Sequence, residues 1–481
     1  MKEIRTRFAP SPTGFLHVGG VRTALFAWLL ARQSGGSFVL RIEDTDKARE
    51  VDGSAAHIIE CLSALGIDYD EGPGAEGEYG PYLQSDRLDI YRQWAQRLID
   101  SGRAYADPYT AEELTQFRDE ARAAKQPFLY RNHRPENPPT WQPGMPLRFK
   151  SNPQTYTWND AVMGELTTGP EVIDDIILIK SDGYPTYNFA HIVDDAEMKI
   201  THVIRGQEFI SSQPNYLNLY DALGLEYPVF ATMPHILAET GGKKLGKRDG
   251  AKDVLDYLRD GYVPEALVNF IASLGWNDGT EQEIFTVDEL IEKFSLDRVQ
   301  RSGARFDTRR LLWMNGQHIR TLSLDILNDR VQDFWSPAAL NASEAQRTEI
   351  LSLVQDRLKT LADLPVLTSY FFEEPTPDWS LCFNNKQLKK LTPDTIHTLL
   401  SAAIDTLSSI PPEDFTASKL QSSLDTLLET TEQKAGVLFS LIRLSVSWAP
   451  FSPALPDTLA ALGKQTTLDR LARSLETLPR P

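Results

Sequence analysis

Residues 7–20 of the chain read RFAPSPTGFLHVGG, and this stretch decides the fold. It continues a short β-type run at residues 4–8, and its prolines and glycine exclude a helix over residues 9–14. Apolar residues then recur at helical spacing from Val21 to Leu29, and a second β-type run follows at residues 37–42. Strand, loop, helix and strand predict the start of a parallel, doubly wound sheet, in which ligands bind at the carboxyl ends of the strands.

The strand and helix pattern continues to about residue 232, and beyond about residue 320 the chain is predicted to be helical. Further sheet elements are expected in three segments: strands at 201–206 and 228–232 and a helix at 213–223. A Pro-rich and aromatic-rich stretch precedes them, and beyond about residue 320 glycine almost vanishes and segments of helical length follow, at 344–364, 386–407 and 418–447. We therefore expect an α/β sheet domain with an inserted α+β subdomain, followed by an all-helical C-terminal region. The expected boundaries are 1–102 and 191–250 for the two halves of the sheet domain, 103–190 for the insertion, 251–320 for a helical connector and 321–481 for the helical region.

Composition limits the class of protein. The chain has 481 residues, of which 41% are hydrophobic and 24% charged, which excludes a disordered or collagen-like chain. With 49 Lys and Arg against 67 Asp and Glu the formal net charge is −18, so a nucleic-acid partner would have to be held by local basic clusters. No apolar run approaches the roughly 20 residues of a membrane helix, and the first residues are charged, so we expect no membrane association and a cytoplasmic protein.

The two cysteines offer little chemistry. Cys61 and Cys382 are far apart in sequence and neither belongs to a C-x-x-C pair. This excludes a disulfide framework and a thiolate zinc site, and both are interpreted as inert core residues.

The loop at residues 7–20 has the composition of a phosphate and nucleoside site. Gly19 and Gly20 lack the Cβ atoms that would block a base or ribose, and the N–H groups of the following helix start suit phosphate oxygens. His17 can donate a hydrogen bond to the same phosphates. The alternative is a Pro/Gly turn whose histidine only caps the helix, and the tetrapeptide HVGG alone does not decide between them.

A second loop, GGKKLGKRDG at residues 241–250, carries four positive side chains on a glycine-rich backbone. Such a loop can neutralise the charge of a departing pyrophosphate, which is transition-state stabilisation and not proton transfer. A solvated basic turn is the alternative for an isolated charge run. The first loop favours the phosphate interpretation, because it supplies the other half of a nucleotide site.

These motifs, with others, resemble those of the bacterial-type glutamyl-tRNA synthetases, a family of class I aminoacyl-tRNA synthetases. The similarity covers the first 320 residues and, more weakly, the helical tail. Besides the two loops it rests on RIEDTD at 41–46, SDGYPTY at 181–187, VDD at 193–195 and THVIRG at 201–206. The resemblance implies ATP-dependent activation of L-glutamate to glutamyl-adenylate and transfer to the 3′-terminal ribose of tRNA(Glu), releasing AMP and diphosphate.

The resemblance also assigns roles to residues by motif position. It implies that His17, Lys244 and Lys247 are catalytic and stabilise the α-phosphate in its transition state. ATP would be bound by Gly14, Gly19 and Gly20 together with those three residues. For glutamate, Arg7 and Arg205 suit carboxylate contacts, and Glu43 and Ser11 can accept from the ammonium. Tyr187 and His191 complete the implied glutamate-binding set.

Three positions depart from the family pattern. Gly246 replaces a serine in the lysine loop, which removes a hydroxyl donor and loosens the loop. His191 and Asn188 stand in exchanged order, so His191 is expected to face the substrate where the family has an amide. Phe209 stands where tryptophan is common, which is expected to enlarge the pocket slightly.

Partners and cofactors follow from the same resemblance. The implied tRNA-binding residues are Arg301 and Arg305 after the catalytic core and Arg357, Lys389 and Lys390 in the helical tail, although each could equally lie on a solvated helix face. The implied cofactors are ATP and Mg²⁺ bound through its phosphates. No metal is expected on cysteine or histidine, and no zinc, because the insertion lacks cysteine. A monomer is the default for the family, and tRNA(Gln) as a second substrate stays open.

Two rival functions remain. A glutaminyl-tRNA synthetase shares the catalytic motifs but has a β-barrel C-terminal half, which the helical tail disfavours. A catalytically silent tRNA-binding regulator derived from a synthetase is disfavoured by the presence of His17, Lys244 and Lys247, and is kept open by Gly246.

Overall fold

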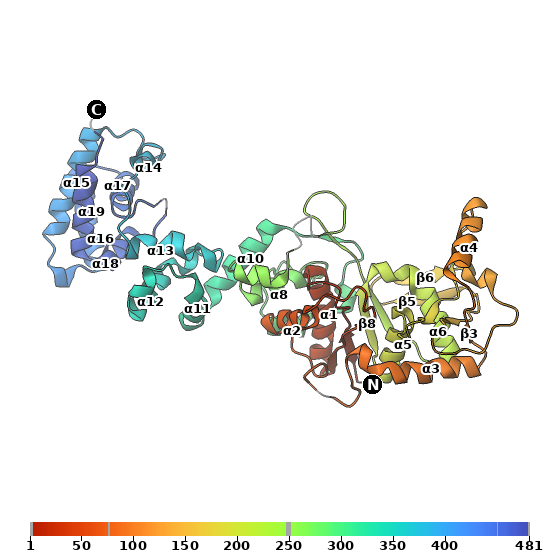
Figure 1. Cartoon of the computed structure of the whole chain (residues 1–481). Helices are drawn as coiled ribbons and strands as arrows, with labels where there is room; N and C mark the ends of the chain where they lie inside the picture. The colour runs from red at the N-terminus through yellow and green to blue at the C-terminus, as the bar shows by residue number, and fades with distance from the viewer. Residues whose placement is uncertain (1–2, 76, 247–251, 450, 480–481) are drawn as a thin grey trace. The chain divides into compact units, whose positions relative to one another are not determined.

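The protein is described from a computed structural model over residues 3–75, 77–246, 252–449 and 451–479. Two compact units make up the chain. The first consists of residues 1–259 and 264–311, and the second of residues 260–263 and 312–481 (Figure 1). Each unit is described separately below.

A four-stranded parallel sheet forms the centre of the first unit. Its strand order is β2-β1-β8-β9, with β1 at Arg5–Phe8, β2 at Ser37–Leu40, β8 at His202–Gly206 and β9 at Val229–Met233. Helix α1 (Val18–Ser34) connects β1 to β2 and packs beside β1 and β8 (Figure 1), while α6 (Gln213–Leu223) connects β8 to β9. The expected doubly wound sheet is confirmed.

The strand order fixes where a ligand can bind. From β1 the chain moves outward to β2 on one side, and from β8 it moves outward to β9 on the other. The two connections therefore diverge between the adjacent strands β1 and β8. In open α/β sheets the crevice for ligands lies at such a switch point, outside the carboxyl ends of the strands.

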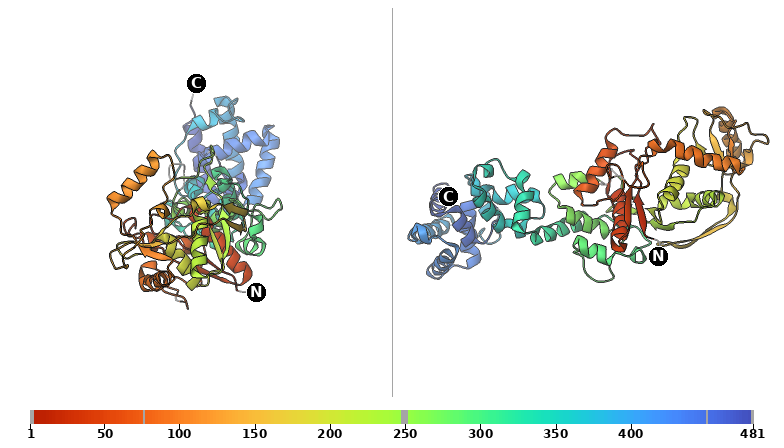
Figure 2. Two further views of the ribbon diagram at one scale, coloured as in Figure 1. Left: turned by 90° about the vertical axis from the view of Figure 1, so that its right-hand side faces the viewer. Right: turned by 90° about the horizontal axis from the view of Figure 1, so that it is seen from below.

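The region between the halves of the sheet is a small α+β subdomain. Strands β3 (Ala104–Ala106), β4 (Leu147–Phe149) and β7 (Ile177–Ile179) form an antiparallel sheet, and β5 (Tyr156–Asp160) pairs with β6 (Gly164–Thr168) as a hairpin. Helix α4 (Ala111–Ala123) buries none of its residues and projects from the subdomain in both Figures 1 and 2. The last element, α5 (Tyr187–Glu197), runs across position 190, so the boundary expected there falls inside a helix.

Buried ion pairs, together with apolar packing, hold this subdomain. Asp107 accepts hydrogen bonds from Arg148 Nε at 2.6 Å and from the Tyr130 hydroxyl at 2.5 Å. Asp175 accepts from Arg134 and from the Tyr105 hydroxyl, each at 2.6 Å. Hydrogen bonds from a guanidinium and a phenol offset the cost of removing each aspartate carboxylate from water.

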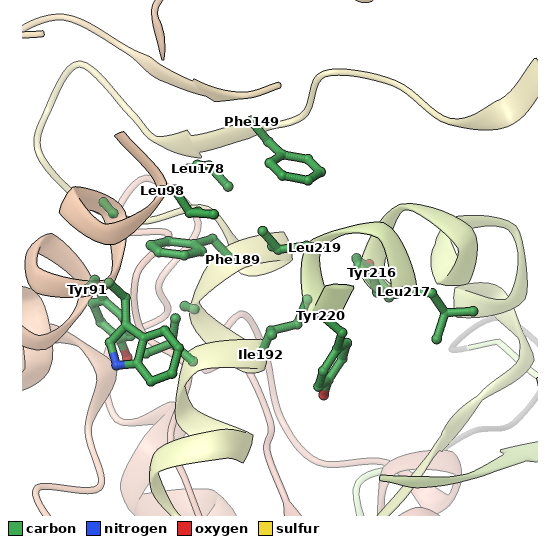
Figure 3. Packing of buried hydrophobic residues seen from close by; sticks show 14 of the residues in the cluster. Tyr91, Leu98, Phe149, Leu178, Phe189, Ile192, Tyr216, Leu217, Leu219 and Tyr220 are labelled. Atoms are coloured by element: carbon green, nitrogen blue, oxygen red, sulfur yellow. The ribbon is translucent and has the colours of Figure 1, made fainter. Parts of the chain in front are cut away.

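One hydrophobic core cluster of the first unit joins the insertion to the sheet domain. Figure 3 shows Leu98 from α3 (Leu88–Asp100) close to Leu178 and Phe189, with Leu219 from α6 nearby. Phe189 and Leu219 are fully buried. Because α5 and α6 contribute to this one core, the expected insertion and the second half of the sheet are packed as a continuous body.

The remaining elements of the first unit are short. They are α2 (Ser54–Ala64), β10 (Ile236–Leu237), α7 (Val254–Arg259), α8 (Pro264–Ala272), α9 (Val287–Lys293), β11 (Ala304–Arg305) and α10 (Thr308–Thr321), of which the last continues into the second unit. Short 3₁₀ helices in the described parts of both units are η1 (Gln84–Arg87), η2 (Tyr130–His133), η3 (Pro170–Val172), η4 (Gln207–Ser212), η6 (Leu296–Arg298), η7 (Gln332–Phe334), η8 (Ala339–Asn341), η9 (Gln355–Arg357), η10 (Leu361–Asp363) and η11 (Pro412–Asp414).

The second unit contains no strand among its described residues, which confirms the expected helical region. Its helices are α11 (Leu324–Arg330), α12 (Glu344–Val354), α13 (Leu364–Phe372), α14 (Trp379–Phe383), α15 (Pro393–Ser408), α16 (Ala417–Thr431), α17 (Ala435–Ser447), α18 (Leu455–Leu462) and α19 (Lys464–Glu476). Fully buried leucines such as Leu400, Leu424 and Leu441 form its core. Within the described ranges no helix has both the length and the apolar content needed to cross a bilayer.

The three long helices expected in this unit are wrong in their bounds. The expected helix at 344–364 ends at Val354, because Thr360 and Asp363 cap a new turn before α13. The helix expected from residue 386 begins at Pro393, where Thr392 caps its first turn. The helix expected over 418–447 is two helices, separated where Glu432 adopts a left-handed backbone conformation with φ 54°. Caps and single backbone reversals override the apolar periodicity in each case.

Candidate active site

A pocket of about 430 Å³ opens at the carboxyl ends of β1 and β8, at the switch point of the sheet. It brings together eight of the residues singled out by sequence, namely Arg7, Ser11, His17, Gly19, Gly20, Tyr187, Arg205 and Lys244. Among the described residues that line it, Glu208 alone carries a carboxylate. The pocket is therefore strongly cationic within an acidic protein, which suits a polyanionic ligand.

His17 has a defined hydrogen-bonding role at the start of α1. Its Nδ1 accepts a hydrogen bond from the Gly19 N–H at 3.0 Å, so His17 is the N-cap of the helix. A neutral imidazole whose Nδ1 accepts must have its proton on Nε2. His17 thus caps the helix through Nδ1 and can donate a hydrogen bond through Nε2. The two interpretations from the sequence, a helix cap and a donor to phosphate, are therefore compatible.

Tight packing leaves little room for a side chain at positions 19 and 20. A Cβ atom on Gly20 would lie 2.6 Å from Leu16 Cδ1, and one on Gly19 would lie 3.0 Å from the His17 ring. Side chains at these positions would displace the His17 loop. The glycines therefore keep the floor of the pocket open at the positive end of the helix.

Lys244 is held at the mouth of the pocket by backbone pairing. The Ala238 N–H donates to the Lys243 carbonyl at 2.9 Å and the Leu245 N–H donates to the Ile236 carbonyl at 2.8 Å. The Lys244 Nζ lies 3.8 Å from Glu208 Oε1. Lys247, the other expected catalytic lysine, lies outside the described residues.

A second chamber of about 390 Å³ shares Ser11, Tyr187 and Phe209 with the first and is lined in addition by Glu43. Three buried polar atoms on residues that line the two chambers have no hydrogen-bond partner among the described residues: Glu43 Oε2, Arg205 Nη1 and Arg22 Nε. An unsatisfied buried donor or acceptor costs about 1–3 kcal/mol. Unsatisfied atoms on an acidic side chain and on basic side chains suit a ligand that carries both an ammonium and a carboxylate.

The neighbours of Arg205 restrict it to one orientation. Its Nη2 donates to Gln213 Oε1, and its guanidinium carbon lies 5.0 Å from the ring centre of Tyr216 and 5.2 Å from that of Phe209. Aromatic faces stabilise a guanidinium without neutralising it. Arg205 therefore keeps its charge available for an incoming carboxylate.

Arg7 and Glu43 belong to one buried chain of ion pairs. Asp195 Oδ1 accepts from Arg7 Nε at 3.1 Å and from Arg41 Nη1 at 2.8 Å, while Arg41 Nη2 donates to Glu43 Oε1 at 2.9 Å. Burial opposes ionisation of Asp195, but Arg7 and Arg41 outweigh it and lower its pKa to about 2. At Glu43 burial prevails over Arg41 and raises the pKa to about 7.

Tyr187, His191 and Phe209 form an aromatic stack beside the pocket. The Tyr187 ring lies 4.7 Å from that of His191 and 5.3 Å from that of Phe209. His191 Nδ1 lies 2.7 Å from the Tyr187 carbonyl oxygen, and burial followed by repulsion from Arg205 lowers the pKa of His191 to about 3. His191 is 2% exposed and lines neither chamber, so it is a neutral residue behind Tyr187.

Other expected site residues lie elsewhere. Gly14 does not line the pocket, and its carbonyl accepts from the Ser54 hydroxyl at 2.7 Å. Arg301 and Arg305 are exposed in the first unit. Arg357, Lys389 and Lys390 are exposed in the second unit. Their binding roles remain predictions.

Two charged residues that line the pocket were not foreseen. Arg22 on α1 donates to the Leu274 carbonyl at 3.1 Å and to the Pro234 carbonyl, and burial lowers its pKa to about 10. Glu208 faces Lys244 and lies 3.8 Å from His235 Nδ1. The only sequence signal for Arg22 was a charged residue among the apolar positions of α1, and Glu208 had none beyond its place after THVIRG.

Comparison with known proteins agrees with this geometry. Residues 3–313 match the family described as tRNA synthetases class I (E and Q), catalytic domain, and residues 327–475 match an anticodon binding domain. The chain belongs to this class I tRNA synthetase family. Two similar proteins, from Chloroflexus aurantiacus (41% identical) and Dehalococcoides mccartyi (38%), are both named glutamate–tRNA ligase; each alignment covers 99% of this chain and 98% of the relative. A crystal structure of a glutamate tRNA ligase from Elizabethkingia meningosepticum in complex with its amino acid is 34% identical, with a TM-score of 0.88 over 99% of this chain and 100% of that chain.

The pKa of Glu43 gives this synthetase a testable pH dependence. Below pH 7 Glu43 becomes neutral and can no longer attract the ammonium of the amino-acid substrate. Because kcat/KM reports ionisation in the free enzyme, we expect it to fall about tenfold for the amino acid between pH 8 and pH 6. Glu43→Gln should have a lower kcat/KM than the native enzyme at pH 8, and its kcat/KM should not change between pH 8 and pH 6. Glu112→Gln, on the exposed face of α4, should follow the native pH profile. A native profile without this fall would contradict the role of Glu43.

Proposed function

We propose that the protein is a glutamate–tRNA ligase. It activates L-glutamate with ATP and transfers the glutamyl group to the 3′-terminal ribose of tRNA(Glu). The observation that carries this proposal is the unsatisfied pair Glu43 Oε2 and Arg205 Nη1 at the switch point of the sheet, in a chain similar over its whole length to ligases of that name.

The pocket suits the two ends of glutamate. The ammonium pairs with Glu43 and the Ser11 hydroxyl, and the side-chain carboxylate pairs with Arg205 and Arg7. Tyr187, whose hydroxyl lies within electrostatic reach of Glu43 and Arg205, packs over the substrate. The buried Arg205 disfavours the neutral amide of glutamine, because its guanidinium would face no countercharge there.

Adenylation requires positioning and charge neutralisation more than a base. An oxygen of the substrate α-carboxylate attacks the α-phosphorus of ATP, the bond to the β-phosphate bridging oxygen breaks, and diphosphate leaves. The His17 Nε2–H, the N-terminus of α1 and Lys244 supply donors and positive charge to the phosphates, with Lys247 as a further lysine of the same loop. A terminal ribose hydroxyl of the tRNA then attacks the carbonyl carbon and AMP leaves.

Mg²⁺ enters with ATP. Since Glu208 is the sole carboxylate among the described lining residues, the phosphates supply the oxygen ligands that Mg²⁺ prefers. The ion would neutralise charge on the departing diphosphate. We infer no zinc requirement, because ion pairs at Asp107 and Asp175 already hold the insertion.

We further propose that residues 103–190 contact the acceptor end of the tRNA, with Arg301 and Arg305 on its stem, and that residues 321–481 contact the anticodon arm through Arg357, Lys389 and Lys390. Support for the last assignment comes from a group of charges around Tyr370. The Tyr370 hydroxyl and Arg443 Nε are buried without a partner among the described residues, and burial followed by repulsion from Arg357 lowers the pKa of Arg443. Two arginines beside an unsatisfied hydroxyl suit the edge of an unstacked base.

We infer a monomer in the cytoplasm as the working form, and tRNA(Gln) as a possible second acceptor to be decided by experiment. The glutaminyl and silent-regulator alternatives are less favoured, because the chain is similar to glutamate–tRNA ligases throughout and its pocket retains His17 and Lys244.

The function is tested by attachment of labelled glutamate to purified tRNA(Glu) and tRNA(Gln) with ATP, in parallel with labelled glutamine. We expect glutamate to be attached to tRNA(Glu) and glutamine to neither tRNA. Lys244→Ala should reduce the rate by about 100-fold or more, as expected when a preorganised donor to a phosphate is removed. Attachment of glutamine, or binding of both tRNAs without any charging, would overturn the proposal in favour of one of the two rivals.

The tRNA-binding proposal is tested with Arg443→Gln and Arg357→Gln. Each should raise KM for tRNA(Glu) about tenfold, since a base contact of this kind contributes about 1–3 kcal/mol, while KM for glutamate stays unchanged. Lys419→Gln removes the same charge from an exposed position on α16 and is the matched control. Equal KM values for tRNA in all three variants would contradict the assignment.

A further inference from the structure

His57 on α2 contacts two segments that the reaction requires, although no step of the mechanism uses it. Its ring touches the loop that ends in His17, and it also reaches Asp253, which comes six positions after Lys247 in the sequence. The side chain is only 13% exposed. His57 therefore links the His17 loop to the segment that begins at Asp253, after the lysine loop in the sequence.

The first set of contacts is with the His17 loop. His57 Nδ1 lies 3.5 Å from the Leu16 N–H, and its ring centre lies 4.6 Å from that of Phe15. Ser54, the first residue of α2, donates its hydroxyl to the Gly14 carbonyl at 2.7 Å. Helix α2 thus braces three consecutive residues of the loop, directly before His17.

The second contact is with Asp253. His57 Nε2 lies 2.6 Å from Asp253 Oδ2, while Asp253 Oδ1 accepts from the Leu255 N–H at 2.9 Å and so caps the start of α7. The backbones of His17 and Asp253 form an antiparallel bridge, and the Val254 N–H donates to the Leu16 carbonyl at 3.4 Å. Asp253 is therefore tied to the His17 loop both directly and through His57.

The geometry favours a hydrogen-bonded link over a metal site. Cys61 Sγ lies 3.6 Å from His57 Nδ1, so histidine, cysteine and aspartate ligand atoms do gather here within 4.8 Å of one another. However, two ligands of one tetrahedral zinc, each about 2.0 Å from the ion, would lie roughly 3.3 Å apart, farther than the 2.6 Å between His57 Nε2 and Asp253 Oδ2. Burial also raises the pKa of Cys61 to about 12, which keeps it a neutral thiol.

We propose that His57 is a positioning residue for adenylate formation, which holds the His17 loop and the Asp253 segment in register through its two ring nitrogens. This inference rests on the proposed ligase function. His57 acts on adenylate formation, in which the α-phosphate is attacked and diphosphate leaves. It does not act on recognition of glutamate, because none of its contacts reaches Glu43, Arg7 or Arg205.

The test measures glutamate-dependent exchange of pyrophosphate into ATP with tRNA(Glu) present. His57→Leu loses both ring contacts and should reduce kcat about tenfold, with KM for glutamate within twofold of the native value. His57→Gln can still donate to Asp253 and accept from Leu16, and should recover kcat to within about threefold. Glu60→Gln, on the exposed face of the same helix, should be indistinguishable from the native enzyme.

A second variant tests whether His57 acts through Asp253. Asp253→Ser keeps an oxygen that can cap α7 but cannot span to His57. The double variant His57→Leu with Asp253→Ser should be no slower than the slower single variant. The proposal would be overturned by an unchanged kcat in His57→Leu, or by losses in kcat that multiply in the double variant. It would also be overturned if His57→Gln were as slow as His57→Leu and melted at the same lowered temperature.

Three further outcomes are decisive. Stoichiometric, tight Zn²⁺ binding by calorimetry that disappears in Cys61→Ser would make the group a metal site and overturn the positioning role. If the native enzyme charges tRNA(Glu) and the His57 variants match it, the inference fails while the ligase function stands. If the native enzyme charges no tRNA, the ligase function itself has failed.

Discussion

The site depends on one buried carboxylate. Asp195 comes from α5, and it accepts hydrogen bonds from Arg7 on β1 and from Arg41 just after β2. The three groups are almost fully buried, so none of them could be ionised there without the others. The adjacent Asp194 binds Arg87 Nε at 2.7 Å and extends the same network toward α3. The carboxyl edge of the sheet and the insertion are thereby fixed to each other before any ligand binds.

This network explains how an acidic protein can present a cationic pocket. Its carboxylates pair with Arg7 and Arg41, whereas Arg205 Nη1 and Glu43 Oε2, on residues that line the two chambers, have no hydrogen-bond partner among the described residues. Preorganised charge of this kind stabilises a transition state without reorganisation during the reaction. It also costs stability, because a buried group without a partner is destabilising until a ligand pairs with it. This loss of stability arises at the few atoms that a ligand with two opposite charges would pair with.

Local signals in the sequence predicted the sheet, whereas most of the pocket residues came from the family resemblance. The RFAPSPTG loop excludes helix, the apolar spacing after it requires one, and the residues at the ends of β1 and β8 converge through topology. What sequence could not supply was contact between distant positions, such as Arg7 with Asp195, which are 188 positions apart. The sequence-based expectation that His191 faces the substrate finds no support in the structure, where His191 lines neither chamber, because both orientations fit the same helix. In the second unit, apolar periodicity continued across Pro393, where a cap begins a helix, and across Glu432, where a backbone reversal ends one.

The most direct measurement of the central claim is a crystal structure of the protein with L-glutamate bound. The claim predicts that the ammonium lies on Glu43 Oε2, that the side-chain carboxylate lies on Arg205, and that the Arg7–Asp195–Arg41 contacts keep their present geometry. Glutamate bound elsewhere, or a network that has to break and re-form around it, would contradict the view that buried ion pairs build the site in advance.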